Sequence, residues 1–467
     1  MRFVFSSFIF IILIAMSCNK DVQIPNPISS VTAGQVFSSD ATATAAMLGI
    51  YSYMSNNQSF SSYETTLYAG ESADELTDET PGYEFYDLFL SNTLSTLQSS
   101  STVLSSFWQP AYFDIYSANA VISGVVSSAG VSASTRNQLT GEAKFIRAFC
   151  YFYLSNLFGD VPLALSTDFN QTALLSKQSK AKIYQQIIAD LLDAQSLMIS
   201  DFSLSNGQPI RANKWAATAL LARVYQYEGQ WQSADSAASA VINSGQFSLI
   251  NNLDSVFLAN SAESILQLQT VNTSIYATQE GFYFIPFNPN LDFANSWLTT
   301  QLLAAFEPND LRRVMWVDST TEYGTTYYYY PYKYKVRVGS SLPAFENYNL
   351  LRFAEQFLIR AEAEANLNQL SLAINDVNTI RNRAGLDSLP SSLTQAQIMS
   401  AIQQEYRIEF FGEWGHRWLD LKRWGIALQT LDTISYKTGN IDSAQLLYPI
   451  PMTEIQTDPN LTQNLGY

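Results

Sequence analysis

Residues suited to catalysis and metal binding are scarce in this sequence. It contains one histidine, His416, and two cysteines, Cys18 and Cys150, among 467 residues. It also lacks the HExxH and CxxC patterns of metal sites, the GxSxG nucleophile turn, the Walker A loop and the GxGxxG loop of dinucleotide-binding folds. We therefore expect no metal, no cofactor and no catalytic residues.

Positive charge is scarce as well. The chain has 25 Lys and Arg against 41 Asp and Glu, a formal net charge of −16, so it would repel a nucleic-acid backbone or an anionic membrane surface. Charged residues make up only 14% of the sequence, while aromatic residues reach 13%. Much of the polar surface must then be uncharged amide and hydroxyl groups. Such a surface suits neutral, hydrogen-bonding ligands and excludes nucleic acid as a partner.

Long apolar runs are absent except at the start of the chain. A run from Phe3 to Ala15 follows Arg2, and it is too short to cross a bilayer comfortably. It ends just before Cys18, in the arrangement of a bacterial lipoprotein cleavage site, although Ala15 stands where leucine is commoner. We predict a signal peptide over residues 1–17 and lipidation of Cys18, which gives stable anchoring. An ordinary signal peptide with an incidental cysteine is the alternative.

The remaining chain divides into a tether and a globule. Residues 18–35 contain two prolines and little periodicity, as a tether would. We predict one globule over residues 36–467, with an N-terminal part at about 36–250 and a C-terminal part at about 251–467. Cys150 has no remaining partner for a disulfide. With no later run of about 20 apolar residues, the mature protein is expected to be anchored in a membrane and not to span it.

Apolar residues recur at helical spacing in several segments. A 23-residue repeat is also present, because residues 220–242 align with residues 359–381 at a constant offset of 139. Gly229 falls on Asn368, where the first helix of each pair would end. This pattern is typical of a tetratricopeptide-type helix pair, and a chance match between two amphipathic hairpins is the alternative. Further helices are predicted at residues 41–54, 103–126, 139–158 and 181–198.

Two irregular, aromatic stretches interrupt the helical pattern, at residues 61–92 and at about 250–340. Binding residues tend to lie on loops held by a rigid scaffold, so we place the ligand site here. Trp297 is the first choice as a platform, because it is the largest ring and precedes a helical run; a packing role is its alternative. The full set of predicted ligand-binding residues is Tyr83, Tyr86, Tyr276, Phe282, Tyr283, Asn288, Asn290, Asn295, Trp297, Tyr323 and Tyr327.

The densest charged stretch, EYRIEFFGEWGHRWLDLKRWG at residues 405–425, contains the single histidine. Glu405 and Glu409 are four residues apart, the spacing of charges along one helix face. His416 could act as a general base or metal ligand between acidic neighbours. We favour a buried, hydrogen-bonded histidine within the scaffold, because it lies at a helix start among paired charges.

This stretch resembles the EGHRWFDLKRWG-type signature of the SusD/RagB family of outer-membrane lipoproteins. Three further stretches resemble the family, in the expected order: GEAKFIRAFCYFYLSNLFGDVPL at 141–163, LLRFAEQFLIRAEAEANL at 350–367 with VNTIRNRAGL at 377–386, and LLYPIPMTEIQTDPNLTQNLGY at 446–467.

The resemblance implies a mainly α fold, a SusD-like α–α superhelix of tetratricopeptide-like pairs with long irregular loops and a few short strands. It implies capture of nutrients at the cell surface for a SusC-like TonB-dependent transporter, with polysaccharide utilisation in one branch and peptide uptake in the RagB branch. The family motifs are scaffold residues and identify no ligand. We expect a non-catalytic glycan-binding protein, because aromatic rings and amide side chains together suit sugars. Binding of peptides, basic ones above all, is the alternative.

An enzyme is the third hypothesis. The acidic residues Glu71, Asp74, Glu75, Asp78 and Glu79 form the densest carboxylate cluster in the sequence, and paired carboxylates can hydrolyse glycosidic bonds. A solvated loop or a weak calcium site is the more ordinary interpretation of such a cluster.

Overall fold

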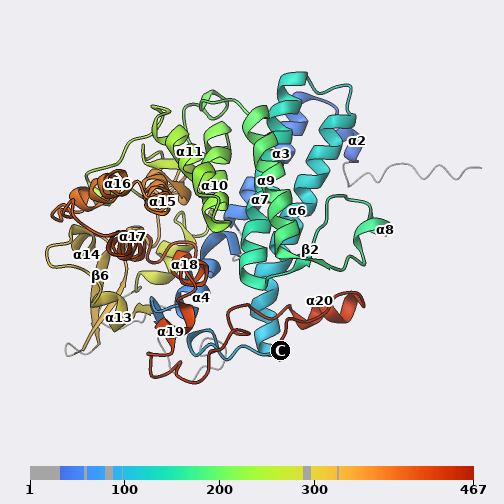
Figure 1. Cartoon of the computed structure of the whole chain (residues 1–467). Helices are drawn as coiled ribbons and strands as arrows, with labels where there is room; N and C mark the ends of the chain where they lie inside the picture. The colour runs from blue at the N-terminus through green and yellow to red at the C-terminus, as the bar shows by residue number, and fades with distance from the viewer. Residues whose placement is uncertain (1–31, 57–59, 79–87, 97, 288–295, 323–325) are drawn as a thin grey trace, which may run out of the picture.

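Helices dominate the structure, and its strands are few and short (Figure 1). The computed structural model describes residues 32–56, 60–78, 88–96, 98–287, 296–322 and 326–467. Cys18 and the predicted signal peptide lie outside these residues. Within the described ranges, no helix is both long enough and apolar enough to cross a membrane.

The four helices predicted in the N-terminal half are all present. Ser132 caps the start of α7 by accepting from the backbone N–H of Thr135, and Gly159 ends this helix with φ of 79°. Helix α6 packs on α7, and α7 packs on α9. The bounds of the N-terminal helices are α2 (Ala33–Val36), α3 (Asp40–Asn56), α6 (Gln98–Ser127), α7 (Ala133–Phe158) and α9 (Lys180–Leu197).

The internal repeat is confirmed as two helix pairs. Gly229 and Asn368 end the first helix of each pair in the left-handed conformation, with φ of 66° and 60°. The first helices begin and end at the same 139-residue offset that relates the sequences. Small residues at the crossing allow the helices to approach closely, and α11 packs on α15. The pairs are α10 (Lys214–Tyr227) with α11 (Trp231–Ile242), and α15 (Phe353–Asn366) with α16 (Leu370–Arg383).

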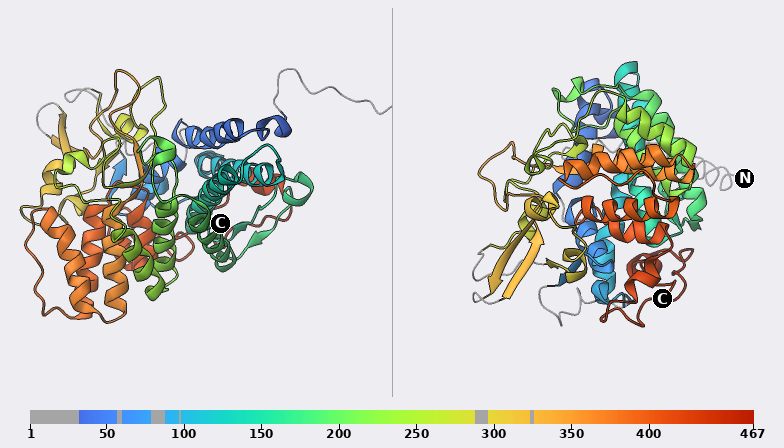
Figure 2. Two further views of the ribbon diagram at one scale, coloured as in Figure 1. Left: turned by 90° about the horizontal axis from the view of Figure 1, so that it is seen from above. Right: turned by 60° about the vertical axis from the view of Figure 1, so that its left-hand side comes forward.

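These helices form one continuous array, in which α9 packs on α10, α10 on α11, α11 on α15 and α15 on α16. Helix α17 (Gln395–Glu409) covers the end of the array, and α18 (His416–Arg423) turns back to contact α4 (Thr65–Ser72). The array is therefore the predicted solenoid-like scaffold, and the chain leaves it between α11 and α15. Figure 2 shows the strands of this excursion at one side of the helices.

The strands form four two-stranded antiparallel pairs within the described residues. In the excursion, β4 (Ser264–Leu268) pairs with β8 (Tyr348–Arg352), and β6 (Val317–Glu322) pairs with β7 (Thr326–Pro331). Elsewhere β1 (Leu76–Asp78) pairs with β5 (Ser296–Leu298), and β2 (Val161–Pro162) with β3 (Lys177–Gln178). The short helical segments are η1 (Phe60–Glu64), α8 (Phe169–Thr172), η2 (Ser203–Ser205), η3 (Leu253–Ser255), α12 (Gln279–Phe284), α13 (Thr300–Leu303), α14 (Leu311–Met315), α19 (Ala427–Leu431) and α20 (Met452–Thr457).

Buried ion pairs join the helical array to the excursion. Arg352 donates to Glu263, Glu409 and Glu413, all at 2.8–2.9 Å, and these four side chains are buried. Burial alone would raise the pKa of Glu409, but the guanidinium groups of Arg383 and Arg352 instead lower it below its usual range. The predicted charge pairing along one helix is only part of this pattern, because most partners come from other elements.

His416 belongs to the same scaffold. Its ring stacks on Phe410 with centroids 4.6 Å apart, and the side chain is buried. Burial lowers the pKa of His416 well below its usual value, and the nearby guanidinium of Arg223 lowers it further. The predicted burial is confirmed. A hydrogen bond from the ring is not found among the described residues, and the stack on Phe410 holds the ring instead.

Candidate functional site

Strand pairing brings the two irregular stretches of the sequence together. Leu76 lies opposite Leu298, and Thr77 lies opposite Trp297. The hydroxyl of Thr299 donates to the carbonyl of Asp74 at 2.6 Å, across 225 positions of sequence. Loops that were predicted separately as binding regions are therefore neighbours in space.

The β6–β7 hairpin supplies four consecutive tyrosines. Alternate side chains of a strand point to opposite faces, so Tyr328 and Tyr330 share one face and Tyr327 and Tyr329 share the other. Tyr328 and Tyr330 pack on Trp297, with centroids 5.1 and 6.5 Å away. Tyr327 is 64% exposed on the opposite face. The hairpin thus has one packed side and a second side on which Tyr327 is exposed.

Helix α12 adds more rings beside β5. Thr278 caps the helix by accepting from the backbone N–H of Gly281. Tyr283 stacks on Tyr63 of η1, with centroids 4.3 Å apart and an angle of 18° between the rings. Burial raises the pKa of Tyr283, so the phenol is neutral and can donate or accept a hydrogen bond.

Arg337 organises the other side of α12. Its guanidinium lies 4.5 Å from the ring of Phe282 and 5.0 Å from the ring of Phe287, and its Nε donates to the carbonyl of Ile285 at 2.9 Å. Phe287 is exposed. Because α12 contacts both η1 and β5, and β5 contacts β7, these rings lie on adjoining elements of one region, in which Tyr327 and Tyr329 point away from Trp297. We name it the aromatic loop face: Tyr63, Phe282, Tyr283, Phe287, Trp297 and Tyr327–Tyr330.

The structure places five of the eleven predicted ligand-binding residues. Phe282, Tyr283 and Tyr327 lie on the aromatic loop face with at least partly accessible rings. Tyr276 is half-buried in a left-handed turn, with φ of 51°, that packs against Gly339. The other predicted residues, apart from Trp297, lie outside the described residues: Tyr83, Tyr86, Asn288, Asn290, Asn295 and Tyr323.

Trp297 differs from its expected role as an exposed platform. It is only 4% exposed and lies beneath the β6–β7 hairpin, in a small cluster with Tyr330. Its position in β5, opposite Thr77, directs the ring toward β7. The alternative packing role predicted for this ring matches its position, although the partner is the hairpin rather than the helix that follows.

Sequence reasoning did not single out several rings of this face. Tyr63 and Phe287 stand outside any motif, and their partners Tyr283 and Arg337 are far away in sequence. The run Tyr327–Tyr330 did contain a signal, because four consecutive aromatic residues in a strand must present rings on both faces. Arg313, from the neighbouring α14, lies 4.6 Å from the ring of Tyr329.

The acidic cluster is not a solvated loop, which corrects that interpretation. Glu71, Asp74 and Glu75 are buried. Asp74 accepts from Arg417 at 2.7 Å and from Arg407 at 2.6 Å. Burial opposes ionisation of Asp74, but the guanidinium groups of Arg417 and Arg407 together lower the pKa of this carboxyl. Asp74 therefore joins the segment between α4 and β1 to α17 and α18. The side chains of Asp78 and Glu79 lie outside the described residues.

Three carboxyl groups near this face resist ionisation. Burial raises the pKa of Glu64 to about 7, despite the hydrogen bond from Ser106. Burial, followed by the charge of Asp74, raises the pKa of Glu75 to about 8. Burial also raises the pKa of Glu280 to about 8, although Thr66 donates to it at 2.6 Å.

These groups fit a supporting role more readily than a catalytic one. Glu75 and Glu280 lie beneath the surface, where a bound ligand would not reach them. Among the residues that the structure describes, no group of three or more His, Cys, Asp or Glu side chains could hold a metal ion. The chemistry offered by the aromatic loop face is stacking on rings, with hydrogen bonds from phenol groups.

Comparisons with known proteins agree with this architecture. A family model described as the SusD family matches residues 307–467, and a second, described as starch-binding associating with outer membrane, matches residues 37–226. SusD-like protein P25 of Formosa agariphila is 26% identical, and the alignment covers 98% of each chain. The starch-binding protein SusD of Bacteroides thetaiotaomicron is 22% identical, over 70% of this chain and 72% of its own length.

A solved structure shows the same fold. A SusD superfamily protein from Bacteroides vulgatus superposes with a TM-score of 0.79 at 25% identity, covering 92% of this chain and 99% of its own. The helical array with loop-built surfaces is thus the architecture of an outer-membrane-associated family of binding proteins. This chain belongs to the SusD/RagB family.

Proposed function

We propose that this protein captures oligosaccharides or polysaccharides on the aromatic loop face and does not cleave them. The observation that supports this most strongly is the grouping of four accessible rings, Phe282, Tyr283, Phe287 and Tyr327, on adjoining elements at one end of a helical scaffold. A sugar ring presents a C–H face that stacks on an aromatic ring, and its hydroxyls bond to phenol and amide groups. The starch-binding relative and the starch-binding family model are consistent with this ligand class.

The anchoring and delivery steps complete the proposal. Lipidation of Cys18 would hold the protein at the outer membrane, in line with the description of the family model that matches residues 37–226. From there it would pass glycan to a SusC-like TonB-dependent transporter. Co-purification of such a transporter with the tagged protein from native membranes tests this step. Its repeated absence would contradict delivery to a transporter and leave glycan capture as a separate proposal.

A binding screen tests the ligand class. The purified protein is applied to a panel of immobilised glycans and, in parallel, to a library of basic peptides. We expect retention on at least one glycan and recovery of that glycan at its original length. Retention by peptides alone would replace the glycan proposal with the peptide alternative, and shortened oligosaccharides in the eluate would show an enzyme.

A further inference from the structure

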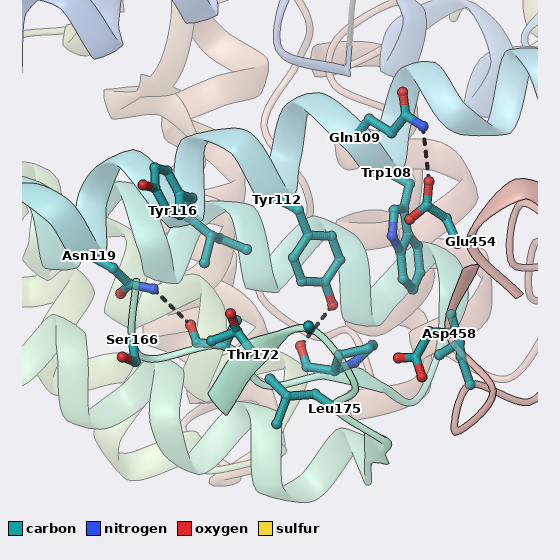
Figure 3. Close-up of a pocket in the computed structure, with 15 residues that line it drawn as sticks. Trp108, Gln109, Tyr112, Tyr116, Asn119, Ser166, Thr172, Leu175, Glu454 and Asp458 are labelled. Carbon is teal, nitrogen blue, oxygen red and sulfur yellow. Dashed lines mark hydrogen bonds between the residues drawn. The ribbon is translucent and has the colours of Figure 1, made fainter. Parts of the chain in front are cut away.

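A second pocket lies away from the aromatic loop face, between α6, the segment 162–175 and α20 (Figure 3). In Figure 1, β6 of the aromatic loop face and α20 of this pocket are on opposite sides of the molecule. The pocket volume is about 400 Å³, within the range of small-molecule sites. Helix α6 forms one wall with three aromatic residues spaced four apart, Trp108, Tyr112 and Tyr116.

Two of the sequence stretches that resemble the family meet at this pocket. The backbone N–H of Tyr448 donates to the carbonyl of Leu157 at 2.7 Å, and Asn464 donates to the carbonyl of Phe158 at 2.7 Å. These bonds hold the C-terminal segment, which includes α20, against the end of α7. The pocket is thus built from segments that are fixed to one another before any ligand binds.

Several of the donors that line the pocket are already used. Figure 3 shows three of them pointing to protein oxygens. They are Tyr112 to the carbonyl of Pro162 at 2.7 Å, Asn119 to the carbonyl of Ala164 at 3.0 Å, and Gln109 to Glu454 at 2.9 Å. These three donors are therefore not available to a ligand.

Acceptors, by contrast, remain open. Glu454 accepts from Gln109 through Oε1, and Asp458 accepts the backbone N–H of Asn460 through Oδ1 at 2.9 Å, which leaves one oxygen of each carboxylate for a ligand. Neither carboxylate forms an ion pair within the described residues, and none of the described residues lining the pocket is basic. Lys177, in the adjacent hairpin, instead donates to Asn464 at 3.2 Å.

We propose that this pocket binds a small ligand carrying an ammonium group. Two uncompensated carboxylates attract a cation, an aromatic wall accommodates both the cation and its hydrocarbon or sugar body, and a cation supplies the donors that the open acceptors need. An amino sugar or the side chain of a lysine in a peptide would provide this chemistry. The site is independent of glycan capture on the aromatic loop face.

Paired titrations of the full-length protein test the proposal. Glucosamine is compared with N-acetylglucosamine, and a capped Ala-Lys-Ala peptide with the same peptide containing norleucine. We expect at least one amine to bind about tenfold more tightly than its neutral counterpart, and the tighter amine identifies the source of the ammonium group. Equal binding of the neutral compounds, or no binding of either amine, would overturn the proposal.

Three variants locate the effect. Asp458→Asn keeps the acceptor for Asn460 but removes the charge, and we expect about tenfold weaker amine binding. Asp387→Asn removes an exposed charge that does not line the pocket and should change nothing. Ala173→Trp should fill the pocket and abolish amine binding. If Asp458→Asn and Ala173→Trp both bind the amine as tightly as the wild type does, this site is refuted. If both variants also bind oligosaccharide normally, the proposed glycan function is unaffected.

Discussion

Trp297 and Tyr327 lie within one group of strands but should fail in different ways when each is replaced by alanine. Trp297 is 4% exposed and packs under Tyr328 and Tyr330, whereas Tyr327 is 64% exposed on the outer side of the hairpin. We therefore expect Trp297→Ala to reduce stability, and Tyr327→Ala to reduce glycan affinity without affecting stability.

The magnitudes follow from burial. Truncation of a buried tryptophan costs about 3–5 kcal/mol of unfolding free energy. The Nε1 donor of Trp297 has no hydrogen-bond partner among the described residues, and a buried unpaired donor already costs about 1–3 kcal/mol. We therefore expect a net loss of about 2–3 kcal/mol. Trp297→Phe, which keeps a ring and removes that donor, should change stability by about 1 kcal/mol or less.

For Tyr327→Ala, we expect a stability change within about 0.5 kcal/mol, as for other exposed positions. The lost stacking would be about 1–2 kcal/mol, which corresponds to about five- to thirtyfold weaker glycan binding. Denaturant titration and calorimetry with the glycan selected by the binding screen measure the two effects separately. Normal stability with lost binding in Trp297→Ala would show that this ring is a platform and that our assignment of the packed side is wrong.

Three further outcomes are expected. Arg352→Ala should lower the unfolding free energy by about 3 kcal/mol in denaturant titrations, because Glu263, Glu409 and Glu413 stay buried and each loses one of its cationic partners; an effect below about 1 kcal/mol would contradict the buried network. His416→Gln should leave glycan binding intact. Because the pKa of His416 is lowered in the folded state, the histidine is protonated at a higher pH in the unfolded chain than in the folded protein. The unfolding free energy of the wild type therefore falls as the pH drops below 6.5, by up to about 1.4 kcal/mol per pH unit for this one group. The difference in unfolding free energy between wild type and His416→Gln, followed against pH, isolates this contribution. A difference that stays constant between pH 5 and 7 would show that folding does not lower the pKa of His416. Cys18→Ala should move the protein out of the salt-washed membrane fraction while its melting temperature stays the same, and continued sedimentation with membranes would refute lipid anchoring.

The helical scaffold was predictable because its signals are local or repetitive. The periodicity of residues 139–158 reflects a helix that is buried along most of its length. The 139-residue offset appears directly in the bounds of α10 and α15, and the left-handed residues Gly229 and Asn368 mark equivalent helix ends. Each of these features depends on neighbours within one helix pair.

The aromatic loop face was predictable only as a region. Pairing of β1 with β5 determines which side of Trp297 is buried, and nothing in either short strand identifies its partner. Likewise, Asp74 reads as a loop acid in sequence, but Arg417 neutralises it from 343 positions away. The exposure of Trp297 and the pairing of Asp74 depend on contacts between segments that are distant in sequence. A local sequence pattern does not identify such contacts.

Hydrogen exchange of the backbone, with and without the glycan chosen by the screen, tests the central proposal most directly. Glycan capture on the aromatic loop face predicts slower exchange in α12, β5 and the β6–β7 hairpin on ligand addition, with little change in α16 or α20. Protection confined to the helical array or to the pocket beside α20, with none in these strands, would place the glycan site elsewhere and contradict the proposal.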